Sequence, residues 1–167
     1  MPMWKELSSK KISVGSELVK IMRRGANPLN QYAIVKKAME LEHEVVPEVL
    51  RRFRNNRTDH FIGIATWVLG KSKYDMAETI AGYYDDMPNP MGQFMALSLL
   101  GFKADESRIP WLISKHDEMK KRHPRETYHF AAWYALLEMY GRFYGAIPNA
   151  TLQARLSHMK VDENDEN

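Results

Sequence analysis

Cysteine is absent from this chain of 167 residues. Its absence excludes disulfide frameworks, thiolate nucleophiles and cysteine-based zinc sites, and it agrees with a reducing compartment. No window approaches the run of about eighteen apolar residues that a membrane helix needs. The opening stretch MPMWKELSSKK also lacks the apolar segment of a signal peptide. We therefore expect a cytoplasmic protein that does not enter a membrane.

Low-complexity stretches and a phosphate-binding glycine loop are also missing. GKSK, at residues 70–73, shares letters with such a loop but lacks its upstream glycine and a preceding strand. With 44% hydrophobic and 27% charged residues, the composition is that of a globular protein large enough to bury a core without a metal. We predict a single domain over residues 1–160, followed by an acidic disordered tail over 161–167.

Charge is unevenly distributed along the chain. The formal net charge is +3, but the terminal segment VDENDEN holds four of the 21 acidic residues, so residues 1–160 carry a net charge of +7. The densest basic cluster comprises Arg51, Arg52, Arg54 and Arg57. Because nucleic-acid binders usually concentrate their charge on one face, solvated helix faces explain this moderate excess more simply than a phosphate-binding track does.

An internal repeat organises the middle of the chain. Three apolar runs end in glycine: FIGIATWVLG at Gly70, GQFMALSLLG at Gly101 and AAWYALLEMYG at Gly141. Pro47 and Glu78 lie 23 residues before the first two glycines, and Pro110 lies 31 residues before the third if EMKKRHPR contains eight extra residues. This spacing predicts a pair of helices that is repeated three times.

The register predicts where each helix begins, ends and packs. Proline is tolerated in a first turn, so Pro47 and Pro110 are expected to begin first helices, and glycine in the left-handed conformation is expected to end the second helices. Helix-starting residues are expected at Thr58 or Asp59, at Asn89, and at Glu126 or Thr127. The core columns are Val46, Ala77 and Ile109; Val49, Ile80 and Leu112; Leu50, Ala81 and Ile113; then Phe61, Gly92 and Ala132; Ile64, Met95 and Ala135; Ala65, Ala96 and Leu136; Val68, Leu99 and Met139.

Residues 44–144 resemble a HEAT-like helical repeat protein. VVPEVLRRF and RIPWLISKH match its first helices, and the small and apolar second helices end in Leu-Gly or Tyr-Gly. The resemblance implies an all-α, right-handed superhelix (α-solenoid) of about four helical hairpins. Residues 13–24 and 29–43 would form a preceding pair, and IPNATLQARLSHMK a C-terminal capping helix.

Two Glu-x-x-His pairs are the strongest candidates for a metal centre. Glu40–His43 and Glu126–His129 have the spacing that projects two ligands from one helix face. Both pairs fall at the ends of predicted helices, whereas a carboxylate-bridged metal pair needs long bundle helices and two further glutamates. A metal-dependent enzyme is therefore a weaker rival, and we predict no catalytic residue, no metal and no cofactor.

The second helices also carry residues that lie off the core stripe. Their columns are Ile62, Gln93 and Trp133, and Trp67, Ser98 and Glu138. Because solenoid second helices usually line the concave side and tryptophan is favoured at interface centres, we predict that Trp67, Gln93, Trp133 and Glu138 bind a protein or peptide partner. The function would be that of a non-enzymatic adaptor or scaffold. In the competing interpretation, Trp67 and Trp133 close the core.

The resemblance leaves an alternative open. HEAT-like folds include DNA glycosylases that use a basic concave face with tryptophans and a carboxylate, so the chain would be a nucleic-acid binder or such an enzyme. In that case Arg51, Arg52, Arg54 and Arg57 would contact nucleic acid. The salt dependence of binding separates the two functions, because phosphate contacts release counterions.

Overall fold

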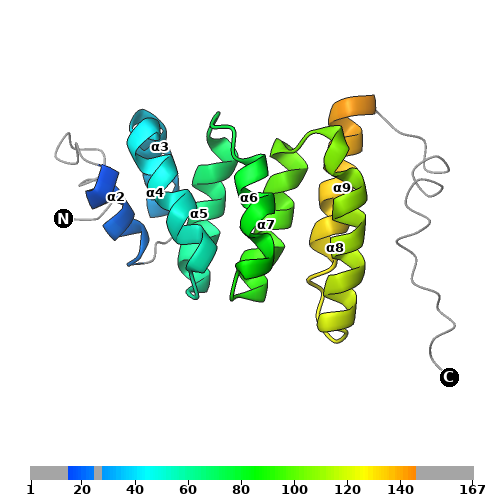
Figure 1. The fold of residues 1–167 in the computed structure, drawn as a ribbon. Helices are drawn as coiled ribbons and strands as arrows, with labels where there is room; N and C mark the ends of the chain where they lie inside the picture. The colour runs from blue at the N-terminus through cyan, green and yellow to red at the C-terminus, as the bar shows by residue number, and fades with distance from the viewer. Residues whose placement is uncertain (1–14, 25–27, 146–167) are drawn as a thin grey trace, which may run out of the picture. The chain divides into compact units, whose positions relative to one another are not determined.

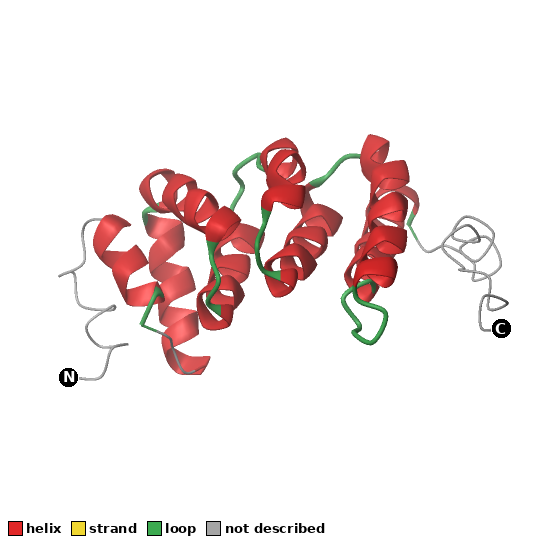
Figure 2. Ribbon diagram, turned by 60° about the horizontal axis from the view of Figure 1, so that its bottom comes forward, coloured by secondary structure: helices red, strands yellow, loops and turns green. Residues whose placement is uncertain are grey.

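The computed structural model describes residues 15–24 and 28–145, and every element in these residues is helical. Figure 1 shows the order of the helices, and Figure 2 shows that helices and loops account for all of the described chain. The elements are α2 (Gly15–Met22), α3 (Pro28–Glu40), α4 (Glu42–Asn55), α5 (Asp59–Lys71), α6 (Ala77–Tyr83), the 3-10 helix η1 (Tyr84–Asp86), α7 (Pro90–Lys103), the 3-10 helix η2 (Glu106–Arg108), α8 (Ile109–Arg122) and α9 (Phe130–Tyr144). The all-α prediction is confirmed for the described residues.

The chain divides into two compact units, Met1–Ala96 and Leu97–Asn167. The division falls inside α7. The first unit therefore contains α2 to α6, η1 and the start of α7, and the second contains the rest of α7, η2, α8 and α9.

Helices α2 to α5 of the first unit pack as two successive pairs. Helix α2 packs against α4, α3 packs against α5, and α2 and α4 also contact their own partners α3 and α5 (Figure 1). The residues that fill this core are apolar and almost completely buried: Leu18, Met22, Ile34, Ala38, Val45, Val46, Val49, Phe53, Phe61, Ile62, Ile64, Ala65 and Val68. These buried apolar side chains form the core between the four helices.

In the second unit α8 packs along α9, and α9 also approaches α7 closely. A Cβ atom at Gly101 of α7 would lie 2.7 Å from the Cα atom of Ala135 in α9, so only glycine fits there. Nearby, the guanidinium group of Arg142 donates hydrogen bonds of 2.8 Å to the Gly101 carbonyl and 2.7 Å to the Ala104 carbonyl. These carbonyls lie in the last turn of α7 and just after it, where helix acceptors lack internal partners.

Helices are present at the positions predicted for the three pairs, as α4 and α5, α6 and α7, and α8 and α9. Thr58 precedes α5 as expected, and Asn89 precedes α7, where its side chain accepts a hydrogen bond of 2.9 Å from the Met91 N–H group. The second helix of the third pair, α9, begins later than expected: His129 precedes it, rather than Thr127 or Glu126.

The prediction that Pro47 begins a helix is wrong, whereas the same prediction for Pro110 is confirmed. Pro110 lies at the start of α8, but α4 already begins at Glu42 and carries Pro47 in its interior. The helix extends upstream because its first turn contains acidic residues, which the helix dipole favours, and because Val45 and Val46 are completely buried. These contributions outweigh the cost of the backbone hydrogen bond that is lost at Pro47.

The prediction that glycine ends each second helix is also wrong. Gly70, Gly101 and Gly141 all lie within helices, which continue to Lys71, Lys103 and Tyr144. Among the described residues, only Gly145 has a positive φ angle, at 69°, and its N–H group donates to the Gly141 carbonyl. The left-handed residue that ends α9 is therefore four positions later than predicted.

No described helix is long and apolar enough to cross a membrane. The predicted capping helix and the acidic tail over 161–167 lie outside the described residues.

Candidate functional site

A groove of about 600 Å³ lies between α3 and α5 in the first unit. We call it the first groove; its lining residues are Gln31, Tyr32, Val35, Lys36, Met39, Trp67 and Lys71. Tyr32 is 70% exposed and Trp67 is 60% exposed, although both side chains are large and hydrophobic. Single exposed apolar side chains are common on protein surfaces, but two aromatic side chains that line the same groove are typical of a binding site.

Helix periodicity explains how these side chains come together. On α3 Tyr32 precedes Lys36 by four residues, and on α5 Trp67 precedes Lys71 by four residues, so each pair occupies one helix face. Because α3 and α5 pack on each other, the two faces meet at the groove. Each wall thus presents an aromatic ring followed, one turn later, by an ammonium group.

A smaller groove of about 380 Å³ lies between α7 and α9 in the second unit. We call it the second groove; its lining residues are Ser98, Phe102, Tyr134, Ala135, Leu137 and Glu138. Phe102 and Tyr134 are exposed aromatic residues here, but the charged group is the carboxylate of Glu138. The two grooves therefore share an aromatic character and differ in the sign of their charge.

The predicted partner-binding residues do not form one surface. Trp67 lines the first groove and Glu138 lines the second, whereas Trp133 is half-buried and lines neither. Gln93 is only 1% exposed, and its amide donates a hydrogen bond of 3.1 Å to the Tyr84 carbonyl. The expectation that Gln93 lies on a surface is therefore wrong, because its side chain closes the turn between α6 and α7.

Sequence reasoning missed most of the first groove. Tyr32, Lys36 and Met39 lie on α3, and the sequence predicts this helix only as part of a preceding pair, with no indication that its exposed face meets that of α5. The signal that could have found them is the aromatic-to-lysine spacing of four residues in both helices. Phe102 and Tyr134 of the second groove carry no comparable pattern.

Three residues of the arginine cluster, Arg51, Arg52 and Arg54, form ion pairs within the protein. Arg51 donates two hydrogen bonds to the Glu48 carboxylate, of 3.0 and 2.9 Å, and Arg52 donates a third of 2.6 Å. The hydrogen bonds from Arg51 have the largest effect on Glu48 and, with the bond from Arg52, lower its pKa to about 2, although burial acts in the opposite direction. Arg54 donates a 2.7 Å bond to Asp86. The cluster lies on and just after α4, so it contributes nothing to the wall of the first groove.

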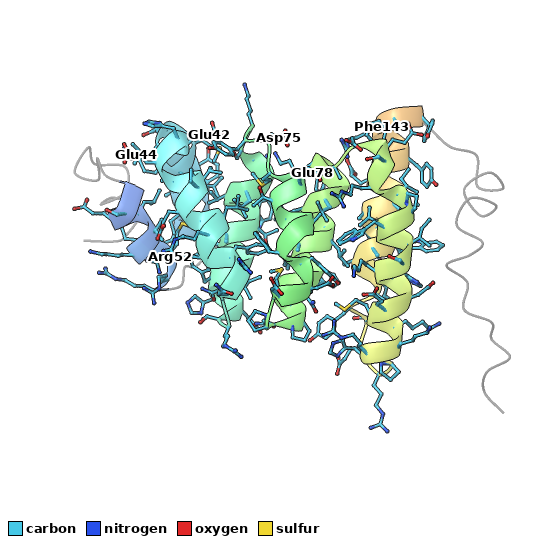
Figure 3. The ribbon with its side chains drawn as sticks, in the orientation of Figure 1. Glu42, Glu44, Arg52, Asp75, Glu78 and Phe143 are labelled. Atoms are coloured by element: carbon cyan, nitrogen blue, oxygen red, sulfur yellow. The ribbon has the colours of Figure 1, made fainter. Side chains whose placement is uncertain are left out.

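Four acidic residues lie along one edge of the first unit, as Figure 3 shows for Glu42, Glu44, Asp75 and Glu78. Glu42 accepts hydrogen bonds of 2.6 Å from the Ser72 hydroxyl group and 2.8 Å from the Lys73 N–H group. Glu44 accepts one of 3.0 Å from the Gly15 N–H group. These two carboxylates therefore connect the start of α4 to neighbouring segments.

Within the described residues, no group of three or more histidine, aspartate or glutamate side chains is placed to hold a metal ion. Glu40 of the first Glu-x-x-His pair forms a 2.9 Å ion pair with Lys37, and the His43 side chain is exposed. In the second pair, the Nδ1 atom of His129 is buried without a hydrogen-bond partner. Burial and the nearby charges of His116 and Lys120 lower the pKa of His129.

Comparison of the chain with models of known protein families, with curated proteins and with solved structures finds no match in any of the three.

Proposed function

We propose that the chain is a non-enzymatic binding module that holds a protein or peptide partner on its second helices. The observation that carries the proposal is the first groove, in which the exposed ring of Trp67 faces the same concavity as Tyr32. Tryptophan and tyrosine supply most of the energy at many interfaces, because they bury a large area with few rotatable bonds. A volume of about 600 Å³ also falls in the usual range of ligand pockets.

The architecture that we propose for this module is a HEAT-like α-solenoid of about four helical pairs with a C-terminal capping helix. The packing of α2 on α4 and of α3 on α5 supports it, because a solenoid stacks equivalent helices of successive repeats. In this arrangement α3 and α5 belong to the concave layer, where such proteins bind extended partners. The absence of cysteine supports the further proposal that the module works in the cytoplasm.

A peptide-display selection on the full chain tests the proposed function. Selected peptides, made synthetically, should bind the unchanged protein and lose about 2 kcal/mol or more of binding free energy with Trp67→Ala, as anchor tryptophans commonly do. Tyr74→Ala is the matched control, because Tyr74 is an exposed aromatic residue that does not line the first groove.

Fluorescence anisotropy measures these affinities, and urea denaturation verifies that each variant is folded. If the selected peptides bind Trp67→Ala as tightly as the unchanged protein, the first groove is not the binding site.

A further inference from the structure

We infer that the segment bound in the first groove is an acidic peptide that carries large apolar anchor side chains. This inference rests on the proposed function and adds the chemistry of the partner. It follows from the charge of the groove: its lining includes Lys36 and Lys71 but no carboxylate.

Neither lysine is neutralised within the described part of the protein. Lys36 and Lys71 form no ion pair with any described residue, whereas their neighbour Lys37 is paired with Glu40. Arg51, Arg52 and Arg54 are likewise held by carboxylates. Two unpaired ammonium groups at the rim of an apolar concavity complement a partner with acidic residues beside its anchors.

The apolar part of the lining of the first groove determines which kind of anionic partner fits. Val35 and Met39 also line the groove, so its lining contains aliphatic side chains as well as aromatic rings. Methionine adapts its shape to apolar side chains of different kinds. Leucine, phenylalanine or tryptophan side chains of a peptide match this apolar lining, and the acidic residues next to them would lie at the lysines.

A nucleic acid is the less favoured occupant. Single-stranded nucleic acids need a continuous basic track beside stacking rings. Arg51 and Arg52 donate to Glu48 and Arg54 to Asp86, so they extend no such track from the groove. An acidic peptide needs only the local pair of cations that the groove contains.

The second groove is an internal control for this inference. It has exposed rings in Phe102 and Tyr134, but its charged group is the carboxylate of Glu138. An acidic peptide is repelled there, so aromatic exposure alone predicts binding in both grooves whereas charge complementarity predicts binding in the first.

The test uses three labelled synthetic peptides that share the same leucine and phenylalanine positions and carry glutamate, glutamine or lysine between them. Binding to the full chain is measured by fluorescence anisotropy at low and high salt, with oligothymidylate as the nucleic-acid probe. The glutamate peptide should bind about tenfold more tightly than the glutamine peptide at low salt, the scale expected for two exposed ion pairs. This preference should shrink at high salt.

Two variants locate the effect. Lys36→Glu combined with Lys71→Glu should abolish or reverse the preference for glutamate, and Tyr134→Ala in the second groove should leave it unchanged. If Trp67→Ala weakens all three peptides equally and none is preferred, the acidic partner is wrong while the proposed function stands. Tighter binding of oligothymidylate than of the glutamate peptide, if it is lost with the paired lysine substitutions, would overturn the inference in favour of a nucleic acid.

Discussion

Two glycines that look equivalent in the sequence have opposite roles in the structure. Gly101 and Gly141 both follow apolar runs, and both lie near the C-terminal ends of helices. At Gly101 an added Cβ atom would lie 2.7 Å from the Ala135 Cα atom, whereas at Gly141 it would meet nothing within 4 Å. Only the packing partner distinguishes these two residues, and a repeat pattern does not contain that information.

We predict opposite effects of the same substitution at these glycines. Gly101→Ala should lower the free energy of unfolding by about 1–3 kcal/mol, because the obstruction is backbone of α9 that has to move. Gly141→Ala should raise it by about 0.5–1 kcal/mol, because alanine favours the helix. Urea denaturation measures both; a stabilising Gly101→Ala would show that α7 and α9 are not in close contact.

His129 makes the stability of the second unit depend on pH. Burial, together with the charges of His116 and Lys120, lowers the pKa of this imidazole below its ordinary value of 6.5. The unfolded chain therefore binds a proton at a higher pH than the folded chain does. The contribution of His129 to stability is therefore expected to be complete above about pH 6.5 and to decrease as the pH falls towards the lowered pKa.

We predict that the urea midpoint decreases between pH 7 and pH 5.5, and that His129→Phe reduces this dependence. Phenylalanine keeps a ring against His116, whose ring centroid lies 5.3 Å from that of His129. His43→Gln is the control, because the His43 side chain is exposed. Glu48 does not interfere, since its pKa lies below the ordinary 4.5 and affects stability only at lower pH. Identical pH profiles for the unchanged protein and His129→Phe would contradict this account.

At the scale of the helices, contacts between helices outweigh the local sequence rules that predict where α4 begins. A proline removes a backbone donor, so the rules place a helix start at Pro47. The structure begins the helix five residues earlier, with only Leu41 between α3 and α4. The hydrogen bond from the Gly15 N–H group to Glu44 and the complete burial of Val45 come from other helices, which local rules do not consider.

The two prolines give a direct test of this helix boundary. Pro47→Ala should raise the free energy of unfolding by about 1–3 kcal/mol, because it restores an interior backbone donor facing the His43 carbonyl. Pro110→Ala should have little effect or destabilise slightly, since proline is tolerated at the start of α8 and restricts the unfolded chain. Equal effects of the two substitutions in urea denaturation would place both prolines in first turns, as the sequence alone predicts.

Much of the helix layout follows from periodicity. The runs that precede Gly70, Gly101 and Gly141 predict α5, α7 and α9, and most of the expected core columns are buried. The site is less predictable, because it depends on which exposed faces meet. The position of Trp67 off the core stripe identifies it as a surface residue, but Gln93 is also predicted off this stripe and turns inward to donate to the Tyr84 carbonyl. No periodicity distinguishes an amide that faces solvent from one that closes a turn.

At the scale of the whole molecule, we propose a binding protein that selects its partner at the first groove, because the two grooves differ in charge. The first groove joins Trp67 and Tyr32 with two lysines, and the second joins Phe102 and Tyr134 with Glu138. The HEAT-like architecture stays a proposal, supported by the packing of α2 on α4 and of α3 on α5.

Whether the partner binds in the first groove is tested by an NMR titration that follows the indole N–H resonances of the four tryptophans as a selected peptide is added. Each resonance is assigned by single substitution of tryptophan with phenylalanine. We predict that the Trp67 resonance shifts with the peptide concentration while that of the half-buried Trp133 stays unchanged. A Trp67 resonance that does not move while that of Trp133 shifts would contradict the assignment of the binding site to the first groove.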